Sequence, residues 1–600
     1  MSEENKDIWI AGITRGHNGG VCLLKNGEVI FATEEERYSR YKYDGGPLAS
    51  MLKIKEYTDK LDYIVVAHTQ SLKDTAGIID FSGDDMYTGW ARKLGLIERK
   101  NVDLRNHPQV MDLSHMHHRL HAACAFYRSG FDEAVAVIVD GAGTFIPMQI
   151  NENEHAYGFE VESLFDCSYP ANFATLFKSI GLKNGGVRTQ IDNVETFGEE
   201  YESVIHDRAG IVKVYEAVTE FCGFPAIEAG KTMGLFPYGE PNENIPPLFE
   251  KGGRVRLSNR NVIIPTYPNS ALVNFQQYDE LKDGLASDLT KLQNRRDLAY
   301  AVQTQSQDQV VEYIRQAVAM SGKKNVVISG GYGLNCVANY HYLEALKDED
   351  INIYVEPVSN DAGTAIGGAL MTYYHLSEST ENKGINHNLY LGIPYTYEID
   401  EIESLAQEYG ATVTDATNED VVDLITSKNI VSVFQGGSES GPRALGNRSI
   451  LYDPKDPDGK DFVNTVKRRE YFRPFAGSIL EEDVHEWFDL RGMESSPTMM
   501  YAVNCQPGIE EKIPAIIHVD GTCRIQTVNR EQNANYYDLI KAFKEKTGCP
   551  IIFNTSFNLG GEPLVETLED AFWTLQQSDI QYLYLPEYGK MLTVPNIKVI

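Results

Sequence analysis

Four histidines occur within seven consecutive residues, at positions 115, 117, 118 and 121, and two of them have the spacing of metal ligands. His117 and His121 are four positions apart, so on a helix their imidazoles lie one turn apart on the same face. Two such imidazoles suit a shared metal ion. The alternative is that they are packing or surface histidines, and the spacing alone leaves both interpretations open.

A two-histidine metal site needs an oxygen ligand from elsewhere in the chain. Asp361, which lies in the segment Ser359-Asn-Asp-Ala-Gly-Thr-Ala-Ile-Gly-Gly368, is a candidate. Its alternative role is a helix N-cap, because an aspartate that precedes small residues and a helical run commonly caps that helix. The local sequence therefore permits a ligand at Asp361 without requiring one.

Basic residues accumulate in the second half of an otherwise acidic chain: Arg443, Arg448, Lys467, Arg468, Arg469, Arg473 and Arg524. Arg443 lies in the turn sequence Gly-Pro-Arg-Ala-Leu-Gly, and Arg473 lies in the apolar segment Tyr-Phe-Arg-Pro-Phe-Ala. A cation in an apolar setting needs an anion, and planar guanidinium groups match phosphate and carboxylate oxygens. The alternative is structural ion pairing with the abundant acidic residues.

The elements that would position these residues follow an α/β pattern. Strands are predicted at Ile8–Ile13, Val21–Leu24 and Val29–Ala32, the last two joined by the hairpin signal Asn26-Gly27. Two further strands, Ala134–Val139 and Asn325–Ser329, each run into a glycine loop, and Asp297–Met320 reads as a helix. Repeated strand, glycine loop and helix units predict an α/β fold with ligands at strand ends.

The glycine loops at 140–144 and 330–333 could bring backbone N–H groups close to phosphate, although each could also be a simple tight turn. The tripeptide Gly230-Lys231-Thr232 imitates the end of a P-loop. The P-loop spacing requires glycine at position 225, where the chain has Pro225, so a P-loop is excluded.

A polar segment without apolar periodicity, residues 377–388, predicts a boundary between a first domain at 1–380 and a second at 389–600. The second domain contains a predicted strand, Ile430–Phe434, which runs into the glycine-rich segment 435–446. A chain of 600 residues is also too long for one hydrophobic core.

The formal net charge is −32, which excludes a polyanionic partner such as nucleic acid or an anionic membrane surface. The eight cysteines include no CxxC pair, which is typical of a reduced, intracellular protein. The first residues have no basic region followed by an apolar stretch, and no apolar run has the length of a membrane helix. We therefore expect a cytoplasmic protein.

Taken in order, these motifs resemble those of the O-carbamoyltransferase family of the nodulation and cephamycin type, which includes tobramycin carbamoyltransferase. The resemblance covers nearly the whole chain. It rests on Gly16-His17, Glu35-Glu36-Arg37 with Arg40 and Lys42, His117-His-Arg-Leu-His121, Asp140-Gly141, Gly230-Lys231, Gly330-Gly331 with Asn335, Asp361-Ala-Gly363, Gly441-Pro-Arg-Ala-Leu-Gly446-Asn-Arg448, Lys467-Arg-Arg-Glu470 with Arg473, His518-Val-Asp-Gly-Thr-Cys-Arg524, and Asn554-Thr-Ser556-Phe-Asn558.

The resemblance implies a fold and a reaction. The first domain would belong to the actin, sugar-kinase and chaperone ATPase superfamily (ASKHA), in its TsaD-like version. The second domain would be a YrdC-like α+β domain that makes carbamoyl adenylate from carbamoyl phosphate and ATP, with Mg²⁺ accompanying the nucleotide. The carbamoyl group would then pass to a hydroxyl of a small molecule. The enzyme could be a homodimer. The resemblance also implies a divalent metal, usually iron, held by His117, His121 and Asp361.

Residue roles follow from the same resemblance. Carbamoyl phosphate and ATP would be bound in the second domain and the nucleotide part of the adenylate in the first. His17 is our candidate for the base that takes the acceptor proton, although it could instead be a polar residue at a strand end. The second-domain set is Arg443, Arg448, Lys467, Arg473, Arg524, Asn554 and Ser556, with Lys42 from the N-terminal region; the first-domain set is Asp140, Gly141, Lys231, Gly330, Gly331 and Asn335.

Two other functions are compatible with parts of the sequence. A nucleotide-binding regulatory ATPase would share the first-domain fold but would have no use for the basic motifs of the second domain. A carbamoyl supplier for a protein partner usually brings Cys/His zinc fingers and an acylphosphatase-like domain, and the sequence contains neither pattern. An O-carbamoyltransferase accounts for both halves.

Overall fold

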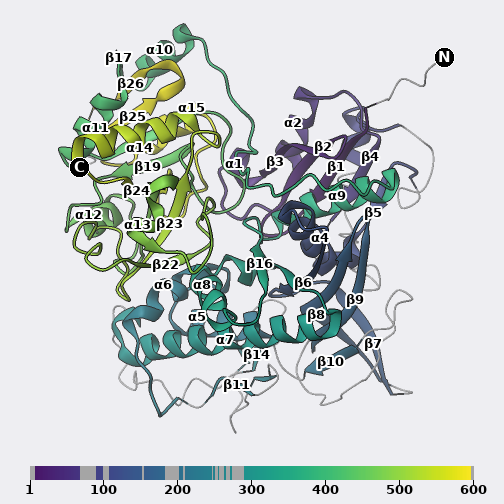
Figure 1. The fold of residues 1–600 in the computed structure, drawn as a ribbon. Helices are drawn as coiled ribbons and strands as arrows, with labels where there is room; N and C mark the ends of the chain where they lie inside the picture. The colour runs from purple at the N-terminus through teal and green to yellow at the C-terminus, as the bar shows by residue number, and fades with distance from the viewer. Residues whose placement is uncertain are drawn as a thin grey trace. The chain divides into compact units, whose positions relative to one another are not determined.

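The computed structural model describes residues 7–67, 89–98, 107–151, 154–182, 202–206, 210–245, 247–250, 254–255, 263–264, 271–272 and 289–595 (Figure 1). Contacts divide the chain into two compact units. The first unit comprises residues 1–35 and 43–386, and the second comprises residues 36–42 and 387–600. Each unit is α/β with mixed sheets.

The first unit contains two sheets with the same strand order. One sheet runs β3 (Glu28–Glu34), β2 (Gly20–Lys25), β1 (Trp9–Thr14), β4 (Tyr63–Val66), β5 (Val110–Asp112). The other sheet runs β9 (Asn172–Leu182), β8 (Glu154–Ser168), β6 (Glu133–Val139), β15 (Asn325–Ser329), β16 (Asn352–Val355). Two more strands extend it: β10 (Glu202–His206) pairs with β9, and β7 (Phe145–Asn151) pairs with β8. In each, three antiparallel strands are followed by two that join in parallel. The unit is therefore an internal duplication of topology.

Two helices pack against each other and against these sheets (Figure 1). Helix α4 (His117–Ser129) packs on β6 and β15, and α9 (Ala362–Ser377) packs on β1, β2 and β4. A Cβ at Gly367 would lie 1.9 Å from the Leu120 carbonyl oxygen, so only glycine permits the two helices to approach this closely. This approach brings the first turns of α4 and α9 together.

The local predictions for the first unit are confirmed. The strands expected at 8–13, 21–24, 29–32, 134–139 and 325–329 are β1, β2, β3, β6 and β15. Asn26 and Gly27 both have positive φ, as a two-residue type I′ turn requires. The expected helix 297–320 is α7, which spans Gln293–Ser321 and packs on β6 and β8.

The second unit is built on one ten-stranded sheet. Its strands, in spatial order, are β17 (Thr412–Asp415), β26 (Lys590–Thr593), β25 (Tyr582–Leu585), β18 (Val431–Phe434), β19 (Arg448–Tyr452), β24 (Ile551–Ser556), β20 (Ala476–Leu480), β23 (Thr522–Val528), β22 (Ala502–Cys505) and β21 (Phe488–Asp489). Helix α14 (Ala534–Thr547) packs on β20, β24 and α11 (Asn418–Thr426). The strand predicted at 430–434 is β18.

The short helix α1 (Glu36–Ser39) belongs to the second unit although both flanking segments belong to the first. None of the helices that the structure describes is long and apolar enough to cross a membrane.

Candidate functional site

Two histidines of α4, His117 and His121, face one another in the buried interior of the first unit. His117 and His121 are both fully buried, and their Nε2 atoms are 3.2 Å apart. Within the described part of the chain, His117 Nδ1 has no hydrogen-bond partner. Two ring nitrogens directed at one point, in a buried setting, are the arrangement that the spacing of four predicts for metal ligands.

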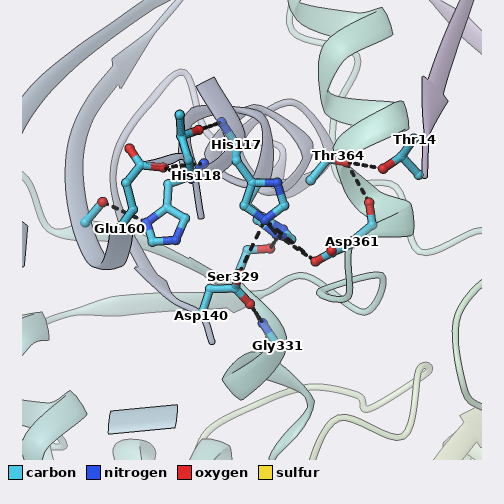
Figure 2. Close-up of polar contacts among 12 residues, drawn as sticks. Thr14, His117, His118, Asp140, Glu160, Ser329, Gly331, Asp361 and Thr364 are labelled. Atoms are coloured by element: carbon cyan, nitrogen blue, oxygen red, sulfur yellow. Dashed lines mark hydrogen bonds and ion pairs between the residues drawn. The ribbon is translucent and has the colours of Figure 1, made fainter. Parts of the chain in front are cut away.

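Two carboxylates from other elements complete the cluster (Figure 2). Asp361 Oδ1 lies 3.6 Å from His117 Nε2 and 3.7 Å from His121 Nε2, and Asp140 Oδ2 lies 3.3 Å from His117 Nε2. Asp361 occupies the N-cap position of α9, but its side chain does not cap the helix. The alternative interpretation of Asp361 as a capping residue is therefore not supported.

The four side chains fit a metal ion. One ligand atom from each of His117, His121, Asp140 and Asp361 lies within 4.8 Å of the others, and all four residues are buried. Imidazole nitrogens combined with carboxylate oxygens suit divalent transition metals such as iron, zinc and manganese. The donor set does not select one of these metals.

The electrostatics of the cluster favour ionised carboxylates. Burial raises the pKa of Asp361, but the charges of His17 and His117 lower it well below its ordinary value overall. Burial likewise opposes ionisation of Asp140, while its hydrogen bond with His117 and the charge of His121 hold its pKa well below the usual range. Both aspartates are thus anionic at neutral pH, as metal ligands must be.

A second layer of contacts fixes the start of α4. Thr144 Oγ1 accepts a hydrogen bond from the His117 backbone N–H at 3.2 Å, and Thr144 N–H donates to Glu160 Oε2 at 3.1 Å. Glu160 also pairs with Lys178. Burial opposes its ionisation, but the charges of Lys178 and His118 hold the pKa of Glu160 at about 2. His118 itself points away from the metal cluster, and its Nδ1 lies 2.8 Å from Ser163 Oγ.

His17 lies on the exposed side of the cluster. It follows β1, its side chain is 48% exposed, and its Nε2 is 3.9 Å from Asp361 Oδ2. A half-exposed imidazole next to a buried carboxylate can exchange a proton with an incoming ligand. The structure therefore brings the predicted base and the predicted metal ligands together.

The two glycine loops meet at the ends of adjacent parallel strands, β6 and β15. Gly331 N–H donates to Asp140 Oδ1 at 2.9 Å. Gly330 has φ +87°, and a Cβ there would lie 2.4 Å from the Val139 carbonyl oxygen. Gly330 is thus required by backbone packing, and Gly141 and Gly331 flank Asp140 on either side.

Two other predicted nucleotide-binding residues have protein partners of their own. Asn335 caps α8 (Cys336–Ala345) by accepting the Ala338 N–H and exchanges hydrogen bonds with Gln303. Lys231, on α6 (Ala229–Leu235), pairs with Glu228 at 2.8 Å. Nucleotide binding by Asn335 and Lys231 stays a prediction, and the described contacts of Lys231 do not place it in the metal cluster.

The second unit contains a cluster of cations whose charges destabilise one another. Lys467 is only 1% exposed, and burial, followed by the charges of Arg469, Arg473 and Lys42, holds its pKa well below the ordinary value. The pKa of Arg469 is lowered by burial and by Arg473, Arg524 and Arg443. We call these six residues, Lys42, Arg443, Lys467, Arg469, Arg473 and Arg524, the cation cluster. A group of this kind is suited to bind a polyanion, which would relieve the repulsion.

One member of the cation cluster, Lys467, contacts polar groups at the end of β24. Lys467 Nζ contacts the Ser556 carbonyl oxygen and lies 3.4 Å from Ser556 Oγ and 3.3 Å from Asn558 Oδ1. Asn554, two residues earlier on the strand, donates to the Ala444 carbonyl oxygen at 3.1 Å. Arg524 Nε is buried and has no hydrogen-bond partner within the described residues. The predicted set Arg443, Lys467, Arg473, Arg524 and Ser556 is therefore gathered in one place.

Arg448 differs from the other predicted residues of this set. It is fully buried, and its terminal nitrogens donate to the carbonyl oxygens of Gln435, Gly436, Asn447 and Glu566. Its guanidinium also lies over the Phe434 ring at 3.7 Å. These contacts hold the loop after β18 in place. Substrate binding by Arg448 stays a prediction, and the contacts of its terminal nitrogens described here are with backbone carbonyl oxygens.

Sequence reasoning assigned Asp140 to the nucleotide rather than to the metal, and it left Arg469 out of the site. Asp140 directly follows strand β6 and precedes a glycine, a signal that identifies a site residue but not its ligand. Arg469 stands in a basic run, Lys467-Arg-Arg, that contains one exposed member, Arg468. The run alone could not separate the clustered arginine from the exposed one.

Two family models match the chain. One described as Carbamoyltransferase N-terminus covers residues 63–370, and one described as Carbamoyltransferase C-terminus covers residues 422–590. Nodulation protein NolNO of Sinorhizobium fredii is 30% identical over 594 residues, which is 95% of this chain and 78% of that protein. The 3'-hydroxymethylcephem-O-carbamoyltransferase of Streptomyces clavuligerus is 28% identical over 364 residues, 59% of this chain and 63% of that protein.

Solved structures give more distant likenesses. Full-length HypF in its phosphate- and nucleotide-bound form is 13% identical with a TM-score of 0.33, over 63% of this chain and 56% of that chain. A ROK family glucokinase from Streptomyces griseus is 8% identical with a TM-score of 0.26, over 60% of this chain and 98% of that chain. At TM-scores this low, these likenesses carry no argument about function.

Proposed function

The chain belongs to the carbamoyltransferase family and is a transferase, and we propose that it is an ATP-dependent O-carbamoyltransferase with one reaction step in each unit. The proposal is carried by one observation: the chain contains two clusters of side chains that prefer ligands of opposite charge. The first unit gathers nitrogen and carboxylate ligands for a cation. The second gathers cations that need an anion.

The first step is the formation of carbamoyl adenylate in the second unit. Water cleaves carbamoyl phosphate to carbamate and phosphate, and a carbamate oxygen then attacks the α-phosphorus of Mg²⁺-bound ATP. Pyrophosphate leaves. Arg443, Lys467 and Arg473 hold the phosphate oxygens, and Arg469 joins them. Preorganised cations stabilise the charge that develops on the departing phosphates without reorganising during the reaction.

The second step is transfer of the carbamoyl group in the first unit. The acceptor hydroxyl oxygen attacks the carbamoyl carbon, the bond to the AMP oxygen breaks, and AMP leaves. His17 takes the acceptor proton at its imidazole, which lies on the exposed side of the cluster. The glycine loops at 140–144 and 330–333 receive the nucleotide part. A divalent metal held by His117, His121, Asp140 and Asp361, usually iron in this family, would act there as a Lewis acid.

The folds implied by the resemblance are part of the proposal. The repeated strand order of the first unit supports an actin- and sugar-kinase-like (ASKHA, TsaD-like) domain at 1–380. The cation cluster beside the ten-stranded sheet supports a YrdC-like domain at 389–600. The acceptor is a small-molecule hydroxyl compound, and the acidic surface disfavours nucleic acid and anionic membranes as partners.

The division of labour is tested with one variant in each unit. Arg443→Ala removes a charge-assisted contact worth roughly 1.5–3 kcal/mol, so pyrophosphate release dependent on carbamoyl phosphate should fall about 10- to 150-fold. His117→Ala should leave that release intact and should block carbamoyl transfer to a pooled metabolite extract, followed by mass spectrometry. Synthetic carbamoyl adenylate should rescue transfer in Arg443→Ala but not in His117→Ala.

Equal loss of pyrophosphate release in two correctly folded variants would contradict the two-site mechanism and favour a single shared site. No release by the wild type would favour the regulatory ATPase instead.

A further inference from the structure

Residues Glu36–Lys42 form an excursion of the chain into the second unit. Residue 35 before them and residue 43 after them belong to the first unit. Ordering such a segment costs backbone entropy, so the segment needs anchors. Arg40 also has φ +58°, a left-handed conformation that is costly for a residue with a side chain. Strong side-chain contacts must therefore hold this segment in place.

Arg40 makes those contacts through all three guanidinium nitrogens. Nη1 donates to the Leu564 carbonyl oxygen at 2.6 Å, and Nη2 donates to the Pro563 carbonyl oxygen at 3.1 Å. Nε lies 3.4 Å from Asp570 Oδ1. The planar fork of arginine makes such contacts in a fixed geometry that the single ammonium of lysine cannot reproduce.

The anchor on the other side is itself rigid. Asp570 belongs to the capping box of α15 (Leu568–Gln576), where its Oδ2 accepts the Thr567 N–H at 2.9 Å. Its second oxygen, Oδ1, faces Arg40. A second contact of the segment, from Arg37 Nη2 to the Gly441 carbonyl oxygen at 3.1 Å, leads to the turn that carries Arg443. Both contacts fix the segment to the second unit, and the Arg37 contact lies two residues before Arg443 of the cation cluster.

Lys42 lies two residues beyond Arg40 and ends the segment that contacts group with the second unit, and its charge lowers the pKa of Lys467. It is therefore the one member of the cation cluster, as defined above, that comes from outside residues 387–600. A lysine side chain is long and has many rotamers, so its charge is directed only if its backbone is held.

We propose that Arg40 is a positioning residue whose clamp on residues 563–564 and Asp570 holds Lys42 in the cation cluster, where Lys42 binds the phosphate oxygens of the substrates. This inference rests on the proposed function for the identity of the substrates. The anchoring contacts of Arg40 do not depend on it.

A double-mutant cycle separates positioning from general stabilisation. If Arg40 acts through Lys42, then Arg40→Met should lower carbamoyl-phosphate-dependent pyrophosphate release about 10-fold in the wild type and have almost no effect once Lys42→Met is present. Arg40→Lys keeps the charge but loses the fork, so it should behave like Arg40→Met. Arg315→Met is the matched control, since Arg315 makes comparable contacts with Glu312 and Glu349 on the surface of the first unit, and it should change nothing.

The same cycle is repeated with inorganic pyrophosphate as an equilibrium ligand, measured by calorimetry. The inference would be overturned if Arg40→Met lowered pyrophosphate release, or pyrophosphate affinity, equally in the wild type and in the Lys42→Met variant. Equal losses mean that the two residues act independently, because independent effects add. Full recovery in Arg40→Lys would also overturn the role of the fork. If the wild type binds pyrophosphate with the expected coupling but releases none from ATP, the proposed function fails while the positioning role stands.

Discussion

The metal cluster of the first unit and the cation cluster of the second unit bury charge in opposite ways. In the first, His117 and His121 face Asp140 and Asp361, so each carboxylate has an imidazole partner. In the second, Lys467 and Arg469 face further cations, with Glu470 and Glu562 as the acidic neighbours that favour their charged forms. One site supplies electron pairs to a cation, and the other supplies charge to an anion.

The comparison shows that local arrangement, rather than net charge, selects the ligand. A chain of charge −32 repels anions at long range. Burial removes water and salt screening from a small group of arginines and lysines, and there their charges dominate. The predictions below test this difference, beginning with the largest expected effect.

The metal site should respond to each of its ligands. Replacing His117, His121, Asp140 or Asp361 with alanine should lower metal affinity by more than the roughly 10- to 100-fold that loss of an outer-shell partner costs. Metal content per chain, measured by mass spectrometry of the purified variants, is the readout. His341→Ala is the control, because that histidine pairs with Asp308 at the surface. Unchanged content in all four ligand variants would remove the metal from the mechanism.

In the cation cluster, unlike the metal cluster, loss of one charge should stabilise the fold and weaken the binding of an anion. Arg469→Met removes one repelling charge, so without an anion the melting temperature should rise by about 2–4 °C, the shift that roughly 1 kcal/mol produces in a domain of this size. The affinity for inorganic pyrophosphate should fall about 10-fold. Arg530→Met, at an exposed arginine paired with Asp538, should do neither. A lower melting temperature in Arg469→Met would show that this residue stabilises the fold instead.

Two glutamates of strand β8 allow a pH-dependent test. Glu160 pairs with Lys178, whereas Glu162 is buried among hydrogen-bond donors and pairs with no cation in the part of the chain that the structure describes. Burial raises the pKa of Glu162 to about 7. The folded state keeps this proton up to about pH 7, and the unfolded state loses it near the ordinary value of 4.5. Stability should therefore fall as the pH rises from about 4.5 to 7, by about 3 kcal/mol, and stay level above.

Glu162→Gln should abolish that part of the pH dependence. The readout is the difference in melting temperature between wild type and variant from pH 5 to pH 8, which should grow with pH in favour of the variant. Glu408→Gln, at an exposed position, is the control. A difference that is constant across this range would mean that Glu162 is already ionised in the folded protein.

Much of the local structure could be predicted from the sequence. The hairpin at Asn26-Gly27, strand β6, strand β15 and helix α7 follow from turn chemistry and from apolar periods of two or 3.6, which involve only neighbouring residues. The pairing of His117 with His121 is local in the same sense, because a helix places residues four apart on one face. The accumulation of basic residues in the second half also needed no structure.

Tertiary structure alone decided which distant residues meet. Asp140 joins His117 because β6 and β15 are neighbours and α4 packs over them, and strand order depends on contacts between segments far apart in the chain. Tertiary structure also decided that Arg448 donates hydrogen bonds to carbonyl oxygens inside the fold. It likewise decided that Lys42, in the segment 36–42, belongs to the second unit. The sequence determined which residues could do chemistry. Packing, through close approaches such as that at Gly367, determined which of them do it together.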